Sequence, residues 1–428
     1  MRMRLDAPDA PCLDTLLAMP AAERWPVARD WIRRAPLPFF AQLRDRQPVL
    51  DCGAVVLVAR RADIAEILSL PQVFSVALYK PKMGAFMLAL DNTEVNYRDK
   101  AVMRAILPWS DLPAIRERAG ALTDAALDAG NGTIDVVASI SRLVPLRIVQ
   151  SVFGIAAPDE DLLRWSYANQ FDQFNNLPFD GRADADAIEA AAVHAREEMR
   201  ATFASLIPAR LAAIESGAEV PDDSLTRLLR LHLPSGAGFG MDRVVINVGG
   251  LLIGAIETTS EAVVNALAEI LKRADVHAAA RAAAVTGTAA FDGYVWEALR
   301  FAPIVAFMFR QTEADHLLGR GGARAISLSK GTVVLPLSLS AMFDPDWVPD
   351  PDRFDPARPD QAYLHFGLGH HECLGRYVAG AMIPEIVRRI LLRTDLRAEG
   401  PVEDGGTPFP TAFRLAYAPT PSADAKAV

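Results

Sequence analysis

The sequence predicts a mainly α-helical protein with small β-sheets. Across residues 91–300, apolar side chains recur three and four positions apart, which is the spacing of one buried helix face. Before residue 60 and after residue 300, the apolar runs are short and lie among Pro, Gly and Asp, as is typical of short strands and turns. Because no linker separates these regions, we expect a single domain at 37–428, preceded by an irregular leader at 1–36 that is rich in proline and charge.

The first elements after the leader are short. Residues 38–46 predict an amphipathic helix, and residues 48–58 predict two strands that turn at Gly53. A helix is expected next, at 62–68. The sequence therefore predicts a small sheet near the N-terminus.

Long helices dominate the middle of the chain. Helical periodicity is clearest at 112–127, 188–214 and 243–273. Residues 174–182 interrupt this pattern with Asn, Pro and Gly, so we expect a loop there that could act as a lid. In the last third, 304–309 and 332–337 predict strands, and 377–392 predict the final helix.

Charge and cysteine content exclude several classes of protein. The formal net charge of −9 argues against general binding to nucleic acid or to an anionic membrane. The longest apolar run, 244–256, contains Asn247 and is shorter than the about 20 residues that a membrane span needs. No apolar segment follows the first arginines, and three widely spaced cysteines form no disulfide framework. We therefore expect a cytoplasmic protein without a membrane span.

The segment from Phe366 to Arg376, FGLGHHECLGR, is the most informative stretch and leads directly into the last predicted helix. Its glycines let the backbone turn close to a flat group, and N–H groups at a helix start lower the pKa of a thiol such as Cys373. Two other interpretations are a buried structural cysteine and a zinc site that also uses His365, His370 and His371.

Six positions of this segment, at fixed spacing, resemble the heme-binding loop of the cytochrome P450 family: Phe366, Gly367, Gly369, His371, Cys373 and Gly375. The zinc interpretation leaves the glycines and the phenylalanine unexplained. The resemblance, to the soluble bacterial type, implies the cytochrome P450 fold, heme b (iron protoporphyrin IX) as cofactor, and Cys373 as the thiolate ligand to iron. Thiolate ligation favours cleavage of the O–O bond.

A second motif precedes this loop. Glu297 and Arg300 lie three residues apart on a predicted helix, where an ion pair can form, and Pro303 follows. Together with the segment 350–358, this pattern resembles the family's E-x-x-R helix and meander. The resemblance implies a buried structural cluster of Glu297, Arg300 and Arg353.

The predicted central helix carries Gly254-Ala-Ile-Glu-Thr-Thr, which resembles the family's A-G-x-D/E-T-T with the two small residues exchanged. The resemblance makes Glu257 and Thr258 the catalytic residues that route protons. A threonine hydroxyl that bonds back to the carbonyl of Gly254 can open the helix locally. The alternative is a buried helix with an incidental polar patch.

The resemblance also implies cofactor and substrate contacts. Arg310 and His371 would bind the heme propionates, since arginine binds such groups in bidentate fashion. The family's histidine near residue 100 is missing, so Arg98 or Lys100 takes that place. The residues expected in the substrate pocket are apolar: Phe86, Met87, Leu90, Ile304, Val305, Ala306 and Phe413.

The expected activity is that of a heme-dependent monooxygenase acting on an apolar small molecule. Residues 236–240 are glycine-rich but lack the spacing of a dinucleotide site, so a ferredoxin-like or flavodoxin-like protein must supply electrons. Two other functions remain open: a heme-thiolate peroxygenase or isomerase that needs no electron donor, and a heme-binding sensor without catalysis.

Overall fold

The computed structural model describes residues 10–91, 93–231, 233–321 and 325–419. The helices of the first third are α1 (Leu13–Ala18), α2 (Ala21–Arg34), α3 (Pro36–Arg46), α4 (Arg61–Ser69), α5 (Lys80–Met83), α6 (Glu94–Ala105) and α7 (Leu112–Ala129). They are followed by α8 (Leu143–Ser151), α9 (Asp159–Asn175), α10 (Ala185–Glu215), α11 (Ser224–Arg230), α12 (Met241–Ala255), α13 (Glu257–Leu271), α14 (Ala274–Thr286), α15 (Thr288–Phe301), α16 (Ser338–Ala341) and α17 (Arg376–Leu391). The fold is therefore mainly helical, as predicted.

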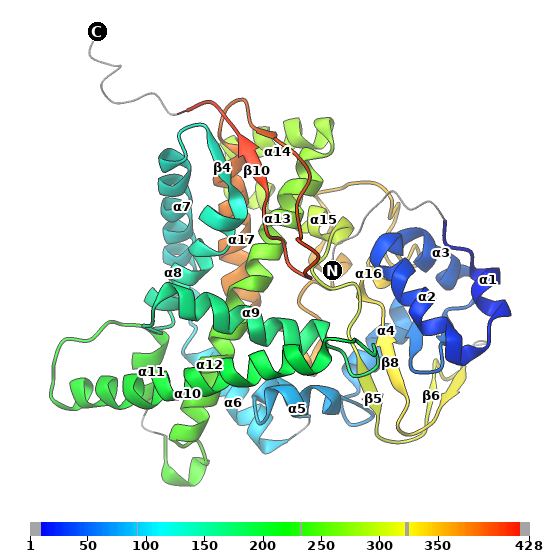
Figure 1. The fold of residues 1–428 in the computed structure, drawn as a ribbon, viewed down its shortest axis with the longest axis horizontal. Coiled ribbons are helices and arrows are strands. Elements are labelled where there is room, and N and C mark those ends of the chain that lie inside the picture. The colour runs from blue at the N-terminus through cyan, green and yellow to red at the C-terminus, as the bar shows by residue number, and fades with distance from the viewer. Residues whose placement is uncertain (1–9, 92, 232, 322–324, 420–428) are drawn as a thin grey trace.

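The strands are short and form three small sheets. They are β1 (Val49–Asp51), β2 (Val56–Val58), β3 (Phe74–Ser75), β4 (Thr133–Asp135), β5 (Arg310–Thr312), β6 (His316–Leu318), β7 (Ile326–Leu328), β8 (Val333–Pro336), β9 (Arg397–Ala398) and β10 (Arg414–Ala416). The largest sheet has the order β1-β2-β8-β5-β3, and its parallel pair β2–β8 joins the start of the chain to its last third. In Figure 1 this sheet and α1–α4 lie on the right, and the long helices lie on the left.

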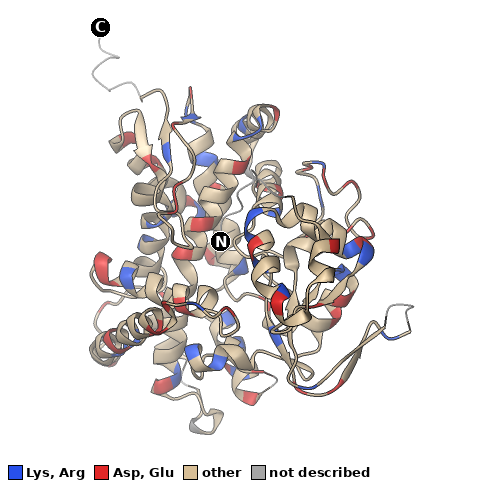
Figure 2. Ribbon diagram, turned by 45° about the vertical axis from the view of Figure 1, so that its right-hand side comes forward, with Lys and Arg blue, Asp and Glu red and all other residues tan. Residues whose placement is uncertain are grey.

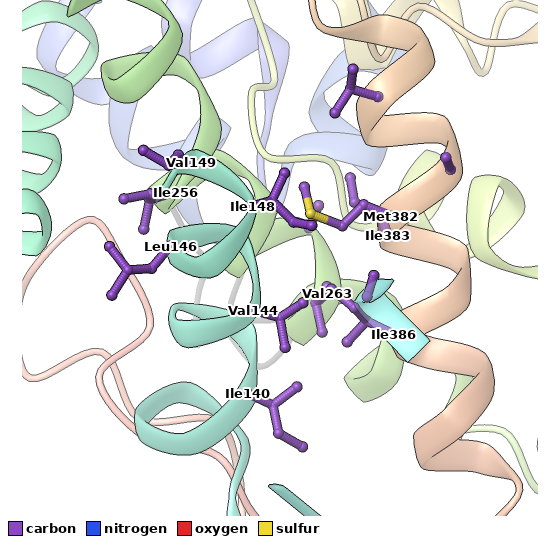
Figure 3. Packing of buried hydrophobic residues seen from close by; sticks show 14 of the residues in the cluster. Ile140, Val144, Leu146, Ile148, Val149, Ile256, Val263, Met382, Ile383 and Ile386 are labelled. Atoms are coloured by element: carbon purple, nitrogen blue, oxygen red, sulfur yellow. The ribbon is translucent and has the colours of Figure 1, made fainter. Parts of the chain in front are cut away.

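Two apolar clusters form the core. The larger one lies among the long helices, and Figure 3 shows Val144 of α8, Val263 of α13 and Ile386 of α17 pointing toward one another. The smaller one lies between the large sheet and the N-terminal helices, and includes Phe39 and Leu335. Figure 2 shows acidic and basic residues intermixed over the outer helices.

Most predicted elements are confirmed, with small shifts at their ends. Helices α3, α4, α7, α10 and α17 and strands β1, β2 and β8 cover the expected segments. The loop predicted at 174–182 lies between α9 and α10. The predicted helix at 243–273 is present as α12 and α13, which are separated only at Ile256.

The prediction of an irregular leader at 1–36 is wrong for its described part. Residues 13–18 and 21–34 form α1 and α2, and Trp25, Ala28 and Ile32 of α2 are buried in the smaller cluster. Those positions have helical spacing, and burial of this face outweighs the cost of Pro26 inside the helix. Residues 1–9 lie outside the described part.

The prediction of a strand at 304–309 is also wrong. This segment is irregular, and its backbone bonds to the end of β8 and to α16: Met308 N donates to Pro336 O at 3.0 Å, and Leu339 N donates to Ala306 O at 3.0 Å.

A separate observation concerns membrane spans. By length and composition, Met241–Leu271 resembles a membrane-spanning helix, but 67% of its most apolar window is buried inside the protein, as in the core helix of a globular protein.

Candidate active site

The described residues enclose a cavity of about 840 Å³ that is partly open to solvent. Its lining includes residues of α12 and α13, of the loop that contains Cys373, and of α17. The irregular segment 303–310 also belongs to the lining, while α2, α10 and the loop between α9 and α10 contribute exposed residues to it. The cavity therefore collects residues from almost the whole length of the chain.

The loop before α17 places Cys373 on the cavity wall. Its backbone turns at Gly367, whose φ of +73° favours glycine, and Cys373 N donates to Phe366 O at 2.9 Å. Burial raises the pKa of the Cys373 thiol, whereas the backbone N–H groups of Gly375 and Arg376 and the charge of Lys100 lower it. Phe366, His371, Cys373 and Gly375 all line the cavity.

Cationic and unsatisfied groups on the cavity wall fit an anionic planar cofactor. Arg310 is 4% exposed, and its guanidinium donates to Phe309 O at 2.8 Å and bonds to the hydroxyl of Tyr79. Both ring nitrogens of His371 are buried without a hydrogen bond, although Nε2 lies 3.3 Å from Asp91 Oδ1. Buried donors of this kind need a partner, which the propionates of heme would provide. The thiol, the cations and the apolar walls thus fit heme.

Three residues predicted to contact the cofactor lie off the described cavity wall. Lys100 Nζ donates to the carbonyls of His370 and Glu372 and so supports the Cys373 loop from behind. Arg98 binds the neighbouring Asp99, which is fully buried. Gly369 abuts α4, because a Cβ there would lie 2.7 Å from Leu68 O.

The junction of α12 and α13 brings a hydroxyl to the cavity. Thr258 Oγ1 donates to Gly254 O at 2.6 Å, which confirms the predicted bond, and both residues line the cavity. The helix is interrupted beside this bond, at Ile256. A threonine bonded to the previous turn bends a helix in this way.

The acid of the same motif faces elsewhere. Two guanidinium nitrogens of Arg142 bind Glu257 Oε1, at 2.6 and 3.2 Å, and Glu257 is absent from the described cavity lining. Burial raises the pKa of Glu257, and Arg142 opposes that shift. Glu261, one turn later, lines the cavity instead, because it lies three residues after Thr258 on the same helix face.

The buried charge cluster forms with a different third member from the one predicted. Glu297 and Arg300 have side chains that are 0% exposed and form two hydrogen bonds of 2.7 and 2.9 Å. Arg358 Nε completes the cluster at 3.1 Å from Glu297 Oε1. The Arg353 side chain is 66% exposed and pairs with Asp355, and only its backbone carbonyl reaches Arg300 and Arg358. Arg358 lies five residues after Arg353, and in the folded chain it is the guanidinium of Arg358 that points inward to Glu297.

The cavity contains four of the seven predicted pocket residues: Phe86, Ile304, Val305 and Ala306. Met87 and Leu90 are not in the described lining, since the short turn at 87–89 (η2) presents Leu88 instead. Phe413 packs in the core beside β4, where its backbone carbonyl accepts Val136 N, and Phe409 lines the cavity in its place.

Sequence reasoning missed the part of the lining that comes from α2, because the leader was predicted to be irregular. Arg29 and Arg33 of α2 line the cavity. The helical spacing of Trp25, Ala28 and Ile32 could have revealed the helix, although it does not mark the side on which these arginines lie. A second missed feature is Gly250, where a Cβ would meet the ring of Phe86 at 2.2 Å, so that only glycine lets this ring lie against α12.

His365, also on the cavity wall, provides a pH-dependent contribution to stability. Nε2 of this ring lies 3.0 Å from Trp296 O, so it carries the proton, and burial lowers the pKa from 6.5 to about 4. Below pH 6.5 the His365 ring of the unfolded chain binds a proton, whereas in the native protein this ring stays neutral until about pH 4. The free energy of unfolding should therefore fall by up to about 3 kcal/mol over this range.

Urea unfolding of wild type and His365→Gln between pH 4 and 7 measures this contribution. Glutamine keeps a donor for Trp296 O but does not titrate, so the variant should lose less stability on acidification. Equal pH dependence in the two proteins would contradict the assignment.

Comparison with known proteins identifies the family. The cytochrome P450 family model matches residues 115–405. Cytochrome P450 CYP199A2 of Rhodopseudomonas palustris is 28% identical over 373 residues, which cover 83% of each chain. The erythromycin C-12 hydroxylase of Saccharopolyspora erythraea is 29% identical, over 81% of this chain and 83% of its own.

Solved structures agree with this assignment at the level of the fold. Cytochrome P450 CYP109Q5 from Chondromyces apiculatus has a TM-score of 0.74 at 24% identity, over 91% of this chain and 97% of that chain. CYP164A2 from Mycobacterium smegmatis has a TM-score of 0.75 at 22% identity, over 94% of this chain and 99% of that chain. This chain therefore belongs to the cytochrome P450 family, whose members bind heme b and are monooxygenases and other oxidoreductases.

Proposed function

We propose that this protein inserts one oxygen atom of dioxygen into an apolar small molecule, with electrons from a separate ferredoxin-like or flavodoxin-like protein. One observation carries the proposal: Thr258 and Cys373 open onto a single cavity whose other lining residues are largely apolar. Its volume of about 840 Å³ lies within the range of about 300–1,000 Å³ that is usual for small-molecule sites. The missing dinucleotide motif supports an external electron donor.

The proposed cofactor contacts come from residues that line the same cavity. In this proposal Cys373 ligates the heme iron, Arg310 and His371 bind the propionates, and Phe366 and Gly375 pack beside the ligand. Thiolate-ligated heme, when bound, supplies the activation of dioxygen. Lys100 keeps the cysteine loop in place from outside the cavity through the carbonyls of His370 and Glu372.

Protons and substrate are handled by the chain's own residues. Phe86, Ile304 and Ala306 exclude water and hold an apolar molecule near Thr258. The Thr258 hydroxyl can exchange its bond to Gly254 O for one to a molecule in the cavity. Glu257, which is bound by the partly exposed Arg142, can accept a proton from the solvent side and deliver it to Oγ1 of Thr258 when its side chain turns.

The requirement for an electron donor is tested by comparing two assays, one with dioxygen and an electron-transfer system and one with hydrogen peroxide alone. Purified holoprotein with NADPH, a ferredoxin reductase and a ferredoxin should oxidise apolar test compounds. Hydrogen peroxide alone should support little product, because the proposal derives both electrons from the donor. Turnover with peroxide at the same rate would instead make the protein a peroxygenase, and heme binding without turnover in either assay would make it a sensor.

Thr258→Ala tests whether the hydroxyl directs protons. The variant should bind heme and substrate like wild type and consume reductant, but a larger share of that reductant should appear as hydrogen peroxide. Glu257→Gln should slow the whole cycle by about 10²-fold, since a positioned proton donor typically contributes about 10²–10⁴-fold. The measurement is product formed per reductant consumed, with Thr258→Ser as the control that retains a hydroxyl. An unchanged ratio in Thr258→Ala would show that the threonine only packs the helix.

A further inference from the structure

Positive charge gathers on the cavity lining, although the whole chain has a net charge of −9. Besides Arg310, six basic residues line the described cavity: Arg29, Arg33, Lys82, Arg182, Arg196 and Arg200. Four acidic residues do so: Asp180, Asp184, Glu261 and Asp404. The charged residues of the lining are therefore mostly basic, whereas the net charge of the whole chain is negative. A cation of the lining is available to a ligand only where no partner within the protein holds it.

Four of the six cations are held by the protein itself, and Lys82, Arg182 and Arg29 are three of them. Lys82 Nζ binds Asp172 Oδ1 at 2.8 Å and the carbonyl of the same residue at 2.7 Å. Arg182 forms two bonds to Asp184, at 2.7 and 2.9 Å. Arg29 Nη1 donates to Asp180 O at 3.0 Å and lies 3.4 Å from the carboxylate of that residue. These side chains shape the loop between α9 and α10 and have little left to offer a ligand.

Helix α10 presents two arginines to the cavity on one face. Arg196, Met199, Arg200 and Phe203 all line the cavity, and their spacing of three and four residues places them in one row. Arg196 Nη1 donates to Asn169 Oδ1 at 3.2 Å and lies 3.6 Å from Asp172 Oδ2. The Arg200 side chain is exposed, and within the described structure it forms no hydrogen bond or ion pair.

Helix α2 repeats this arrangement. Arg29 and Arg33 lie four residues apart on the side of the helix that reaches the cavity. Arg29 is bound to Asp180, whereas Arg33 is exposed and, in the part of the chain that is described, has no polar partner. Each helix therefore has one arginine paired to the protein and one left for a ligand.

The acidic lining residues do not neutralise these two arginines. Asp180 and Asp184 are already engaged with Arg29 and Arg182, and Asp404 belongs to the C-terminal loop, where its carboxylate accepts Gly406 N at 2.9 Å. Glu261 lies on α13, one turn after Thr258. An anionic group that reached Arg33 or Arg200 would meet guanidinium groups with unused donors, which bind carboxylates in bidentate fashion.

We infer that the substrate carries a carboxylate or a similar anionic group, which Arg200 of α10 and Arg33 of α2 bind where the lining is exposed, while its apolar body extends along Met199, Phe203 and Phe86 toward Thr258. This inference rests on the proposed oxygenase function and deepens it by naming the substrate class. The anionic end fixes the molecule in one orientation, so that oxidation falls on carbons remote from the charge.

A matched set of ligands tests the inference. Binding of decanoate, 1-decanol and decylamine to the holoprotein is measured by calorimetry and by the low-to-high-spin change in the heme spectrum. Decanoate should bind about 10-fold more tightly than decanol, as expected for charge-assisted bonds at a partly exposed site, and the difference should shrink as salt rises. Arg33→Gln/Arg200→Gln should abolish this preference and leave decanol binding unchanged.

The control variant is Arg118→Gln, because Arg118 is an exposed arginine of α7 that is not in the described lining; it should keep the preference. Three results would overturn the inference. They are equal or tighter binding of decanol or decylamine to wild type, a preference for decanoate that survives in the double variant, and no binding of any of the three ligands. Oxidation of decanol without any advantage for decanoate would leave the oxygenase proposal intact and refute only the charge. Preferred binding of decanoate without oxidation in the presence of any electron donor would support the anionic substrate and refute the oxygenase proposal.

Discussion

Cys373→Ala should abolish the strongly red-shifted Soret band that the reduced protein shows with carbon monoxide, and all oxidation of substrate with it. The reason is that sulfur donation to iron produces both the spectrum and the reactivity, and alanine has no donor atom. The structure places the thiol on the cavity wall, beside the backbone N–H groups of Gly375 and Arg376. The measurement is a difference spectrum of protein produced with ample heme.

The other two cysteines provide matched controls. Cys12→Ala and Cys52→Ala should both keep the band, because Cys12 lies at the start of α1 and Cys52 is buried in the smaller apolar cluster. Burial raises the pKa of Cys52 to about 12, so its thiol stays protonated. Loss of the band in a control but not in Cys373→Ala, or zinc in place of iron on metal analysis, would refute the assignment.

Glu297→Ala should lower the free energy of unfolding by about 3–5 kcal/mol. Arg300 is fully buried, and without Glu297 its charge would remain in the core with only the carbonyls of Met342 and Arg353 as described hydrogen-bond acceptors. Arg358 and the backbone N–H of Asp355 would lose the same carboxylate. Heme should dissociate more readily as a result, because the segment 353–363 that this cluster anchors leads directly into the Cys373 loop. Urea unfolding and heme retention measure the two effects.

Two arginine variants separate the observed cluster from the one predicted. Arg358→Gln should be clearly destabilising, since Arg358 Nε binds Glu297 and its other nitrogens bind three backbone carbonyls. Arg353→Gln should change stability little, because an exposed ion pair typically contributes about 0–1 kcal/mol. The opposite order would mean that the E-x-x-R helix pairs with Arg353 after all.

Local patterns along the chain determined the fold class and the chemistry of the site. Helical periodicity marked α7, α10 and α17 because each buries one face against the core, and such a face leaves a repeat in the sequence. The motif around Cys373 and the bond between Thr258 and Gly254 were predictable for a related reason. Each depends on residues a few positions apart, whose geometry the local backbone sets.

Only the tertiary structure decided which residues from distant segments meet. Two of these outcomes are choices between near neighbours in sequence: Arg358 and not Arg353 completes the charge cluster, and Phe409 and not Phe413 lines the cavity. A third outcome is that Glu257 faces Arg142 and not the cavity. The alternative residues have the same chemistry, and the packing of elements far apart in the sequence selects among them. The arginines of α2 belong to the same class: their role depends on α2 lying beside the loop between α9 and α10, a contact that leaves no local repeat in the sequence.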